Sequence, residues 1–283
     1  MRTIFTALFL WATAAMADPG VILFRAGDAL TWTAIDSTSV IGRVSGGEAP
    51  PAGYHASMIG LWTTNDATYW WEQVATNKAT LDAGATSSNG YLHFSGAADS
   101  KATADYSTYT NLGQNWTICG WIRLHPSAAN NFFAGTYNYA SSIAVGYGVG
   151  VTCDPSGAGV GIKTGAVSII SGSDVGNNVI WCSTNGTVSY SAWHFFAIVC
   201  TNGQSANWGF HGYLDGNIQA LESWTGEPRQ SYLTHGTNAF MIGGVAGYGI
   251  RSYVDIGNNS LRVFTSALTE SELDTEYSRT DHP

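Results

Sequence analysis

Residues 191–217 are the stretch that most restricts what this chain can fold into. Residues 193–201 are rich in aromatic and β-branched side chains and contain no Gly, Pro, Asp or Asn, which is typical of a β-strand. Turn-forming residues at 202–207 separate this run from a second predicted strand at 208–214. Asp215-Gly216-Asn217 then predicts a tight turn. We therefore expect a long hairpin in the middle of a β-sheet.

Four segments of the chain resemble, in the right order, the strand motifs of laminin-G-like domains. These domains belong to the concanavalin A-like lectin/glucanase superfamily. The segments are WHFFA with YLDG at 193–216, YLHFSG at 91–96, NWTICGWI at 115–122, and MIGG, DI, LRVF and ALT within 241–269. Ser95 stands where the family usually has Asp. The resemblance covers roughly residues 59–278 and implies an all-β, two-sheet antiparallel jelly-roll sandwich with a short C-terminal helix.

The pattern between these motifs agrees with an all-β sandwich. Short strand-like runs recur with turn residues between them, at 132–136, 143–152, 160–163, 167–170 and 179–182. The glycine-rich runs at 146–150 and 157–161 do not complete G-x-G-x-x-G, which argues against a nucleotide-binding loop. Residues 58–81 are ambiguous, because Asn65-Asp66 could cap a short helix running to Val74.

The N-terminal region divides into two parts. Residues 1–17 combine Arg2, an apolar run and Ala15-Met16-Ala17, which predicts a secretory signal peptide. Residues 18–57 precede the family pattern and hold two possible strands at 21–24 and 30–35, followed by a Gly/Pro-rich linker. This arm is too short to build a core of its own. The main domain is expected to span residues 58–283.

Composition restricts the possible partners. The formal net charge is −9, and charged residues make up only 11% of the chain. Nucleic acids and anionic membranes need clustered cations, so neither is an expected partner. No later run is apolar and long enough for membrane insertion. A neutral surface rich in Gly, Ser, Thr and Asn suits a sugar ligand, and it suits contact between copies of the chain equally well.

The even number of cysteines, four, agrees with disulfides in an exported protein. None of them has the C-x-x-C spacing of zinc or redox sites. Four cysteines allow three disulfide pairings. Cys119 and Cys200 lie on the two strands that best match the family, which favours the pairing Cys119–Cys200 with Cys153–Cys182.

Glu272-Leu273-Asp274-Thr275-Glu276 resembles the E-x-D-x-E signature of the superfamily's retaining glucanases. That chemistry needs the carboxylates on one face of a strand. Here Thr269 and Glu272 form a capping box, so a short helix is the preferred interpretation and no catalytic residue is assigned.

Other catalytic and metal signatures are absent from the sequence. There is no G-x-S-x-G, H-E-x-x-H or H-x-H, and His194 is expected to be a hydrogen-bonded core histidine. Because many relatives bind calcium at the rim of the sandwich, Asp99 is a candidate calcium ligand, with a turn-forming role as the alternative.

Aromatic residues supply the candidate glycan site, because flat rings stack on the apolar faces of sugars. Trp116, Trp121 and Trp193 match core strand positions and are expected to be structural. The remaining aromatic candidates lie near predicted turns, with packing as the alternative for each: Tyr137, Tyr139, Trp181, Trp208, Trp224 and Tyr248.

These observations predict a secreted, non-catalytic, lectin-like module that binds an extracellular carbohydrate. The first alternative is a structural protein that assembles with copies of itself, and the second is a glycoside hydrolase. One further expectation concerns residues 193–200, which are apolar on both faces of the predicted strand. The second face needs a cover. We expect the N-terminal arm to provide it, on its own molecule or by adding a strand to a neighbour.

Overall fold

The structure is a computed structural model. It describes residues 22–24, 32–34, 55–64, 69–72, 78–82, 84–88, 90–97, 101–104, 112–126, 131–140, 143–152, 166–172, 178–183, 188–201, 209–223, 239–244 and 252–279. Most of the predicted signal peptide and arm lies outside these residues. Two arm strands are described, β1 (Ile22–Phe24) and β2 (Trp32–Ala34), and they pair only with each other in the described part of the chain.

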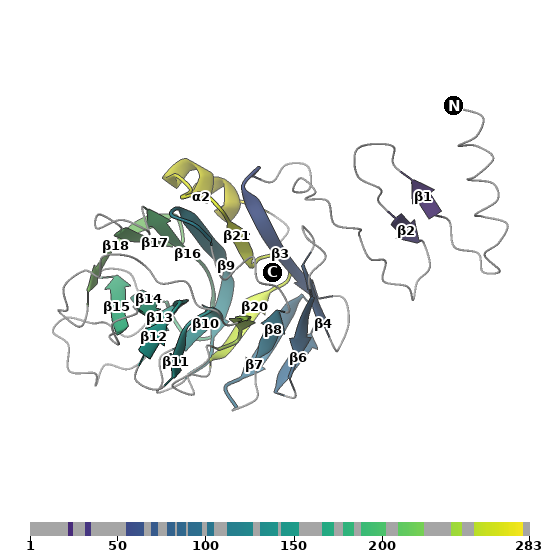
Figure 1. The fold of residues 1–283 in the computed structure, drawn as a ribbon, viewed down its shortest axis with the longest axis horizontal. Coiled ribbons are helices and arrows are strands. Elements are labelled where there is room, and N and C mark those ends of the chain that lie inside the picture. The colour runs from purple at the N-terminus through teal and green to yellow at the C-terminus, as the bar shows by residue number, and fades with distance from the viewer. Residues whose placement is uncertain are drawn as a thin grey trace.

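Two antiparallel sheets make up the main domain, as the jelly-roll prediction requires (Figure 1). In the first sheet, β9 lies at the centre, between β16 on one side and both β20 and β21 on the other. Its strands are β6 (Ala85–Ser88), β7 (Tyr91–Ser95), β20 (Tyr253–Gly257), β21 (Arg262–Phe264), β9 (Trp116–Leu124), β16 (Trp193–Thr201) and β17 (Gly209–Leu214).

The second sheet runs in the order β4, β5, β8, β19, β10, β13, β14, β15. These strands are β4 (Tyr69–Glu72), β5 (Lys78–Leu81), β8 (Ala102–Ala104), β19 (Phe240–Ile242), β10 (Asn131–Gly135), β13 (Tyr147–Thr152), β14 (Ala166–Gly172) and β15 (Asn178–Ser183). A separate hairpin pairs β11 (Asn138–Ala140) with β12 (Ile143–Val145).

Two strands belong to both sheets and join them at opposite edges. The first part of β3 (Met58–Thr64) pairs with β21, and its last part pairs with β4. The first part of β18 (Asn217–Ser223) pairs with β17, and its last part pairs with β15. Strands that change sheets form the corners of such sandwiches.

The hairpin that dominates the sequence is present. The predicted strand 193–201 is β16, and the second predicted strand is β17, one residue shorter at its start. Asp215 and Gly216 both have positive φ, at 46° and 85°, as a two-residue hairpin turn requires. The carboxylate of Asp215 also accepts hydrogen bonds from the backbone N–H of Phe195 (2.8 Å) and the ring of His194 (2.6 Å). The predicted hydrogen bonding of His194 is thus confirmed, but its predicted place in the core is wrong, since the side chain is half-buried.

The main core lies between the two sheets. Even-numbered residues of β9 and β16 point into it, including Trp116, Ile118, Phe196 and Ile198, all of them fully buried. From the second sheet come Phe133, Tyr147, Val149, Val167 and Ile169. Because strand side chains alternate between faces, the odd-numbered residues of β9 and β16 point to the outer face of the first sheet.

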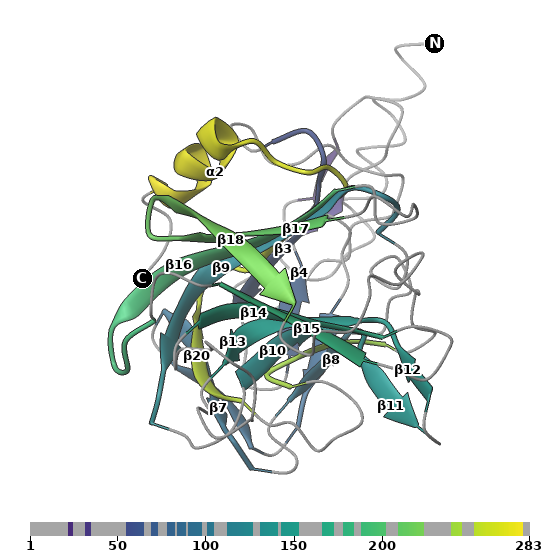
Figure 2. The same cartoon turned by 90° about the vertical axis from the view of Figure 1, so that its left-hand side faces the viewer.

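The C-terminal helix covers part of that outer face, as Figure 2 shows. Helix α2 (Glu270–Tyr277) brings Leu273 and Tyr277 into a second apolar cluster with Phe195, Ala197 and Val199. The doubly apolar character of β16 therefore has a physical explanation within the described chain. Helix α2 thus covers part of the face for which we expected the arm as the cover, and the packing of the arm itself stays a prediction.

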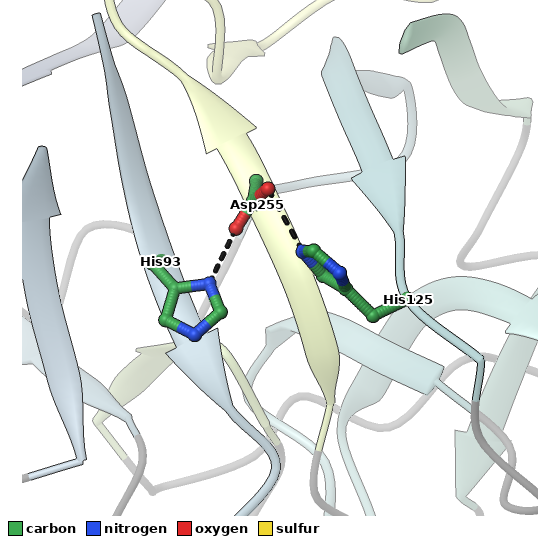
Figure 3. Close-up of side chains that lie close together, drawn as sticks. All are labelled: His93, His125 and Asp255. Atoms are coloured by element: carbon green, nitrogen blue, oxygen red, sulfur yellow. Dashed lines mark hydrogen bonds and ion pairs between the residues drawn. The ribbon is translucent and has the colours of Figure 1, made fainter. Parts of the chain in front are cut away.

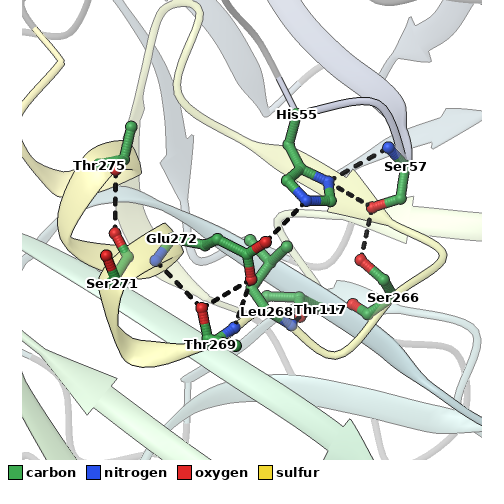
Figure 4. A network of polar contacts seen from close by, with 9 residues as sticks. All are labelled: His55, Ser57, Thr117, Ser266, Leu268, Thr269, Ser271, Glu272 and Thr275. Carbon is green, nitrogen blue, oxygen red and sulfur yellow. Dashed lines mark hydrogen bonds and ion pairs between the residues drawn. The ribbon is translucent and has the colours of Figure 1, made fainter.

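Helix α2 begins with the capping box predicted from the sequence. The Thr269 hydroxyl accepts from the Glu272 backbone N–H, and the Glu272 carboxylate accepts from the Thr269 backbone N–H (2.7 Å). The same carboxylate lies 2.9 Å from the ring of His55, next to a hydrogen-bonded pair formed by Ser57 and Ser266 (Figure 4). Polar contacts with residues just before β3 and just before the helix therefore hold the first turn of α2 in place.

The predicted disulfide Cys119–Cys200 is wrong. Both thiols are free and buried. In the register of β9 with β16, Cys119 lies opposite Ala197, whereas Cys200 lies opposite Trp116. Three residues separate the two positions, about 10 Å along the strand, and they point to opposite faces of the sheet. Cys153 lies outside the described residues, as does the side chain of Cys182, so their pairing stays a prediction.

The short helix suggested between Asn65 and Val74 is wrong in its described part, where Tyr69–Glu72 forms β4. Its pairing partners β3 and β5 explain the outcome, because paired neighbours on both sides outweigh a weak local capping signal. Among the described residues, no helix has the length and apolar character needed to cross a membrane.

Candidate functional site

The outer face of the first sheet continues beyond the area that α2 covers. We call this area the open half, defined by Tyr91 and His93 on β7, Tyr253 and Asp255 on β20, Arg123 on β9 with His125 just after it, and Trp193 on β16. Strand pairing places His93 opposite Asp255, Asp255 opposite Arg123, and Arg123 opposite Trp193. One row across four strands therefore carries an imidazole, a carboxylate, a guanidinium and an indole.

Asp255 has the most partners of any residue in the open half, and Figure 3 shows it between His93 and His125. Its Oδ1 lies 2.6 Å from Nδ1 of His93, and its Oδ2 lies 2.9 Å from Nε2 of His125. The guanidinium of Arg123 donates to the same Oδ2 from Nε (2.7 Å) and lies within 2.6 Å through Nη2. The Asp255 side chain is only 1% exposed, so these three partners enclose it.

The surroundings of Asp255 keep it ionised. Burial by itself raises the pKa of Asp255, but hydrogen bonds from His93, Arg123 and His125 outweigh it, so the net pKa is below the ordinary value. Arg123 shows the reciprocal effect: burial lowers its pKa, while the hydrogen bond and charge of Asp255 raise it, and the net direction is upward.

Half-buried aromatic rings surround the charged pair. The Arg123 guanidinium lies over the rings of Tyr91 (4.9 Å) and Trp193 (5.0 Å). Tyr253 stacks on His125, with ring centroids 4.5 Å apart and an interplanar angle of 20°. Rings locked by such contacts are the rigid surfaces that sugars use for stacking. Trp193, expected to be a core residue, is instead a half-buried member of the open half.

His93, His125 and Asp255 also have the residue types of a metal site, with one possible ligand atom from each lying within 4.8 Å of the others. The guanidinium of Arg123 opposes this use, because it places a positive charge 2.6–2.7 Å from Oδ2 of the same carboxylate. Both carboxylate oxygens of Asp255 already accept hydrogen bonds from the two imidazoles and the guanidinium. The arrangement in the structure is therefore that of a hydrogen-bonded ion-pair cluster.

Most of the residues predicted as glycan or calcium ligands cannot be placed at a site. Tyr137 is fully buried between β10 and β11, so its ring has no face toward solvent. Asp99, Trp208, Trp224 and Tyr248 lie outside the described residues. The side chains of Tyr139 and Trp181 also lie outside them, although the backbones belong to β11 and β15. Those assignments stay predictions.

The three carboxylates of the E-x-D-x-E motif go to three different places. Glu272 belongs to the helix cap, and Asp274 accepts a 2.6 Å hydrogen bond from the hydroxyl of Tyr213. Glu276 is 2% exposed and pairs with the fully buried Arg262 at 2.9 Å. The interpretation of 272–276 as a helix is confirmed, and its carboxylates form no shared site.

Sequence reasoning missed the open half altogether. A signal was present, because Tyr91/His93, Arg123/His125 and Tyr253/Asp255 each place two polar or aromatic residues at i and i+2. That spacing puts both members of a pair on one face of a strand. The pairs are up to about 160 residues apart, so only their strand register brings them together.

Comparison with known proteins identifies the fold. The sequence matches no known family model and no curated protein. The structure is similar to a sialidase of Trypanosoma rangeli in complex with the inhibitor DANA, at 16% identity over 83% of this chain and 35% of the sialidase, with a TM-score of 0.54. The same sialidase in complex with sialic acid matches at 14% identity over 79% and 33%, with a TM-score of 0.50.

A second similar structure is the binding domain of Paraclostridial Mosquitocidal Protein 1, at 9% identity over 78% of this chain and 52% of that domain, with a TM-score of 0.54. This chain thus spans about a third of the sialidase and half of the toxin's binding domain. At these identities the similarity establishes the fold alone. The protein is an antiparallel, two-sheet jelly-roll β-sandwich.

Proposed function

We propose that this protein is a secreted, non-catalytic, lectin-like module of the laminin-G-like kind that binds an extracellular glycan through the open half. The observation that carries the proposal is the row His93–Asp255–Arg123–Trp193, flanked by half-buried rings on a sheet face that α2 leaves uncovered. Glycan sites combine flat apolar rings with fixed polar groups for the hydroxyls. The similar solved structures include a sialidase with sialic acid and a toxin binding domain, which supports this class of function.

A glycan array with the exported protein tests the proposal. Wild type should bind a restricted set of glycans, and Trp193→Ala should weaken that binding at least tenfold, because the indole is the largest half-buried ring of the open half. Ile218→Ala is the control, since Ile218 is a 43% exposed apolar residue at the far end of the same sheet. Equal binding by both variants, or no binding by wild type, would contradict the proposal.

Self-assembly is the second candidate function. In the described part of the chain, β6 pairs with β7 on one side only, so its other edge offers free backbone groups to a strand of another copy. Ser87→Pro would block such pairing, because the register of β6 with β7 directs the N–H of Ser87 away from β7 and toward the free edge. If assembly is the function, sedimentation should show large particles for wild type and smaller ones for the variant. A wild-type monomer at all concentrations would exclude this candidate.

A further inference from the structure

We infer that the open half is built for neutral, hydroxyl-rich glycans, because His93 and His125 present hydrogen-bond acceptors outward and discriminate against acidic sugars while both rings are uncharged. This inference rests on the proposed function and names the class of glycan. It follows from the direction of each hydrogen bond around Asp255, which the geometry and the chemistry of the groups determine.

The first step concerns Asp255. An ionised carboxylate can only accept hydrogen bonds. The short contacts from Nδ1 of His93 and Nε2 of His125 therefore require an N–H on each of these two nitrogens. The Arg123 guanidinium, which only donates, supplies the remaining hydrogen bonds to the carboxylate.

The second step concerns the opposite ring nitrogens. A neutral imidazole carries one N–H, so a proton directed at Asp255 leaves the other nitrogen with a lone pair. These are Nε2 of His93 and Nδ1 of His125, and Figure 3 shows both pointing away from Asp255. The two side chains are 28% and 24% exposed. In the described part of the chain, no protein donor satisfies either lone pair, so both are available to a ligand.

The third step concerns the charge that a ligand meets. The positive charge of Arg123 is neutralised by Asp255 and lies over the rings of Tyr91 and Trp193. A sugar carboxylate or sulfate would place its oxygens against two acceptor nitrogens, and among the described residues that define the open half Arg123 is the only cation. Sugar hydroxyls can donate to the same nitrogens. The geometry therefore favours neutral sugars.

The test has two readouts on the full chain. Nitrogen-15 NMR of the histidine side chains at about pH 8 should show the proton on Nδ1 of His93 and on Nε2 of His125. Glycan arrays at about pH 8 should show neutral glycans preferred over carboxylated or sulfated glycans. The opposite tautomer in either ring, or a preference for acidic glycans, would overturn the inference.

Variants separate this inference from the proposed function. His93→Gln should weaken binding of neutral glycans about threefold to tenfold, the value of one hydrogen bond. His211→Gln is the matched control, because His211 is an exposed histidine on β17 of the same sheet, and it should leave binding unchanged. If no glycan binds, the proposed function fails and the inference falls with it. If glycans bind but acidic ones are preferred, only the inference fails.

Discussion

Two halves of one sheet face show how the same strands can serve stability in one place and recognition in another. On β9, Cys119 and Trp121 lie beneath α2, whereas Arg123 lies on the open half. On β16, Phe195 is covered and Trp193 is half-exposed. The strand geometry is continuous across the boundary. The difference arises because the C-terminal helix ends its contact there, which leaves the polar and aromatic residues accessible.

The two halves also hold their charges differently. Under α2, the buried carboxylate of Glu276 accepts hydrogen bonds from Arg262 and Arg279, each at 2.9 Å, and Arg262 also donates to the carbonyl oxygen of Asn259. On the open half, Asp255 and Arg123 pair just as closely, but the surrounding rings remain partly exposed. The first pair can serve only packing, while the second can meet a ligand. Substitutions should therefore separate the halves by their effect on folding.

The largest expected effect is that of Glu276→Gln. It removes one charge of the buried pair and leaves Arg262 without its counter-charge, which should reduce the free energy of unfolding by about 3–5 kcal/mol. Chemical denaturation at neutral pH measures this. A loss below 1 kcal/mol would mean that α2 contributes little to the covered half.

Leu273→Ala should have the next largest effect. Leu273 is fully buried in the cluster with Phe195 and Val199, so truncation leaves a cavity and should cost about 2–4 kcal/mol. Glycan binding should be unchanged under conditions in which the variant remains folded, because the open half does not include Leu273. A comparable loss of glycan affinity would instead show that the two halves are coupled.

Asp255→Asn tests the open half through stability and pH. The pKa of Asp255 is lowered in the folded state, so the carboxylate contributes stability above its unfolded value, about pH 4, and loses it as the pH falls through the folded value. The variant should be less stable by about 1.5–3 kcal/mol at neutral pH. Denaturation at a series of pH values should show the gap between the two proteins narrowing as the pH falls below about 4. A gap that is constant with pH would contradict the ionised cluster.

The smallest expected effect is that of Glu272→Gln. The pKa of Glu272 is below its ordinary value, because its carboxylate accepts hydrogen bonds from the backbone N–H and the hydroxyl of Thr269. Burial acts in the opposite direction and is the smaller effect. Glu272 is well exposed, and solvent screens its charge, so the loss should be at most about 1 kcal/mol. Glu276→Gln, four residues along the same helix, is the matched comparison. Equal losses from both variants would refute the contrast between the cap and the buried pair.

The sequence by itself determined those parts of the protein that depend on neighbours in the chain. The hairpin β16–β17 follows from composition, its turn from Asp215-Gly216, and the start of α2 from Thr269 and Glu272. Each of these signals lies within a few residues, where backbone propensity and capping chemistry decide the conformation.

Only the tertiary structure decided which distant residues meet. Cys119 and Cys200 lie on two paired strands, but the register places them on opposite faces. His93, Asp255 and Arg123 form one cluster for the same reason, because three strands from distant parts of the chain align in one register. A shift of one residue would turn every one of these side chains to the other face, and long-range strand packing is what specifies the register.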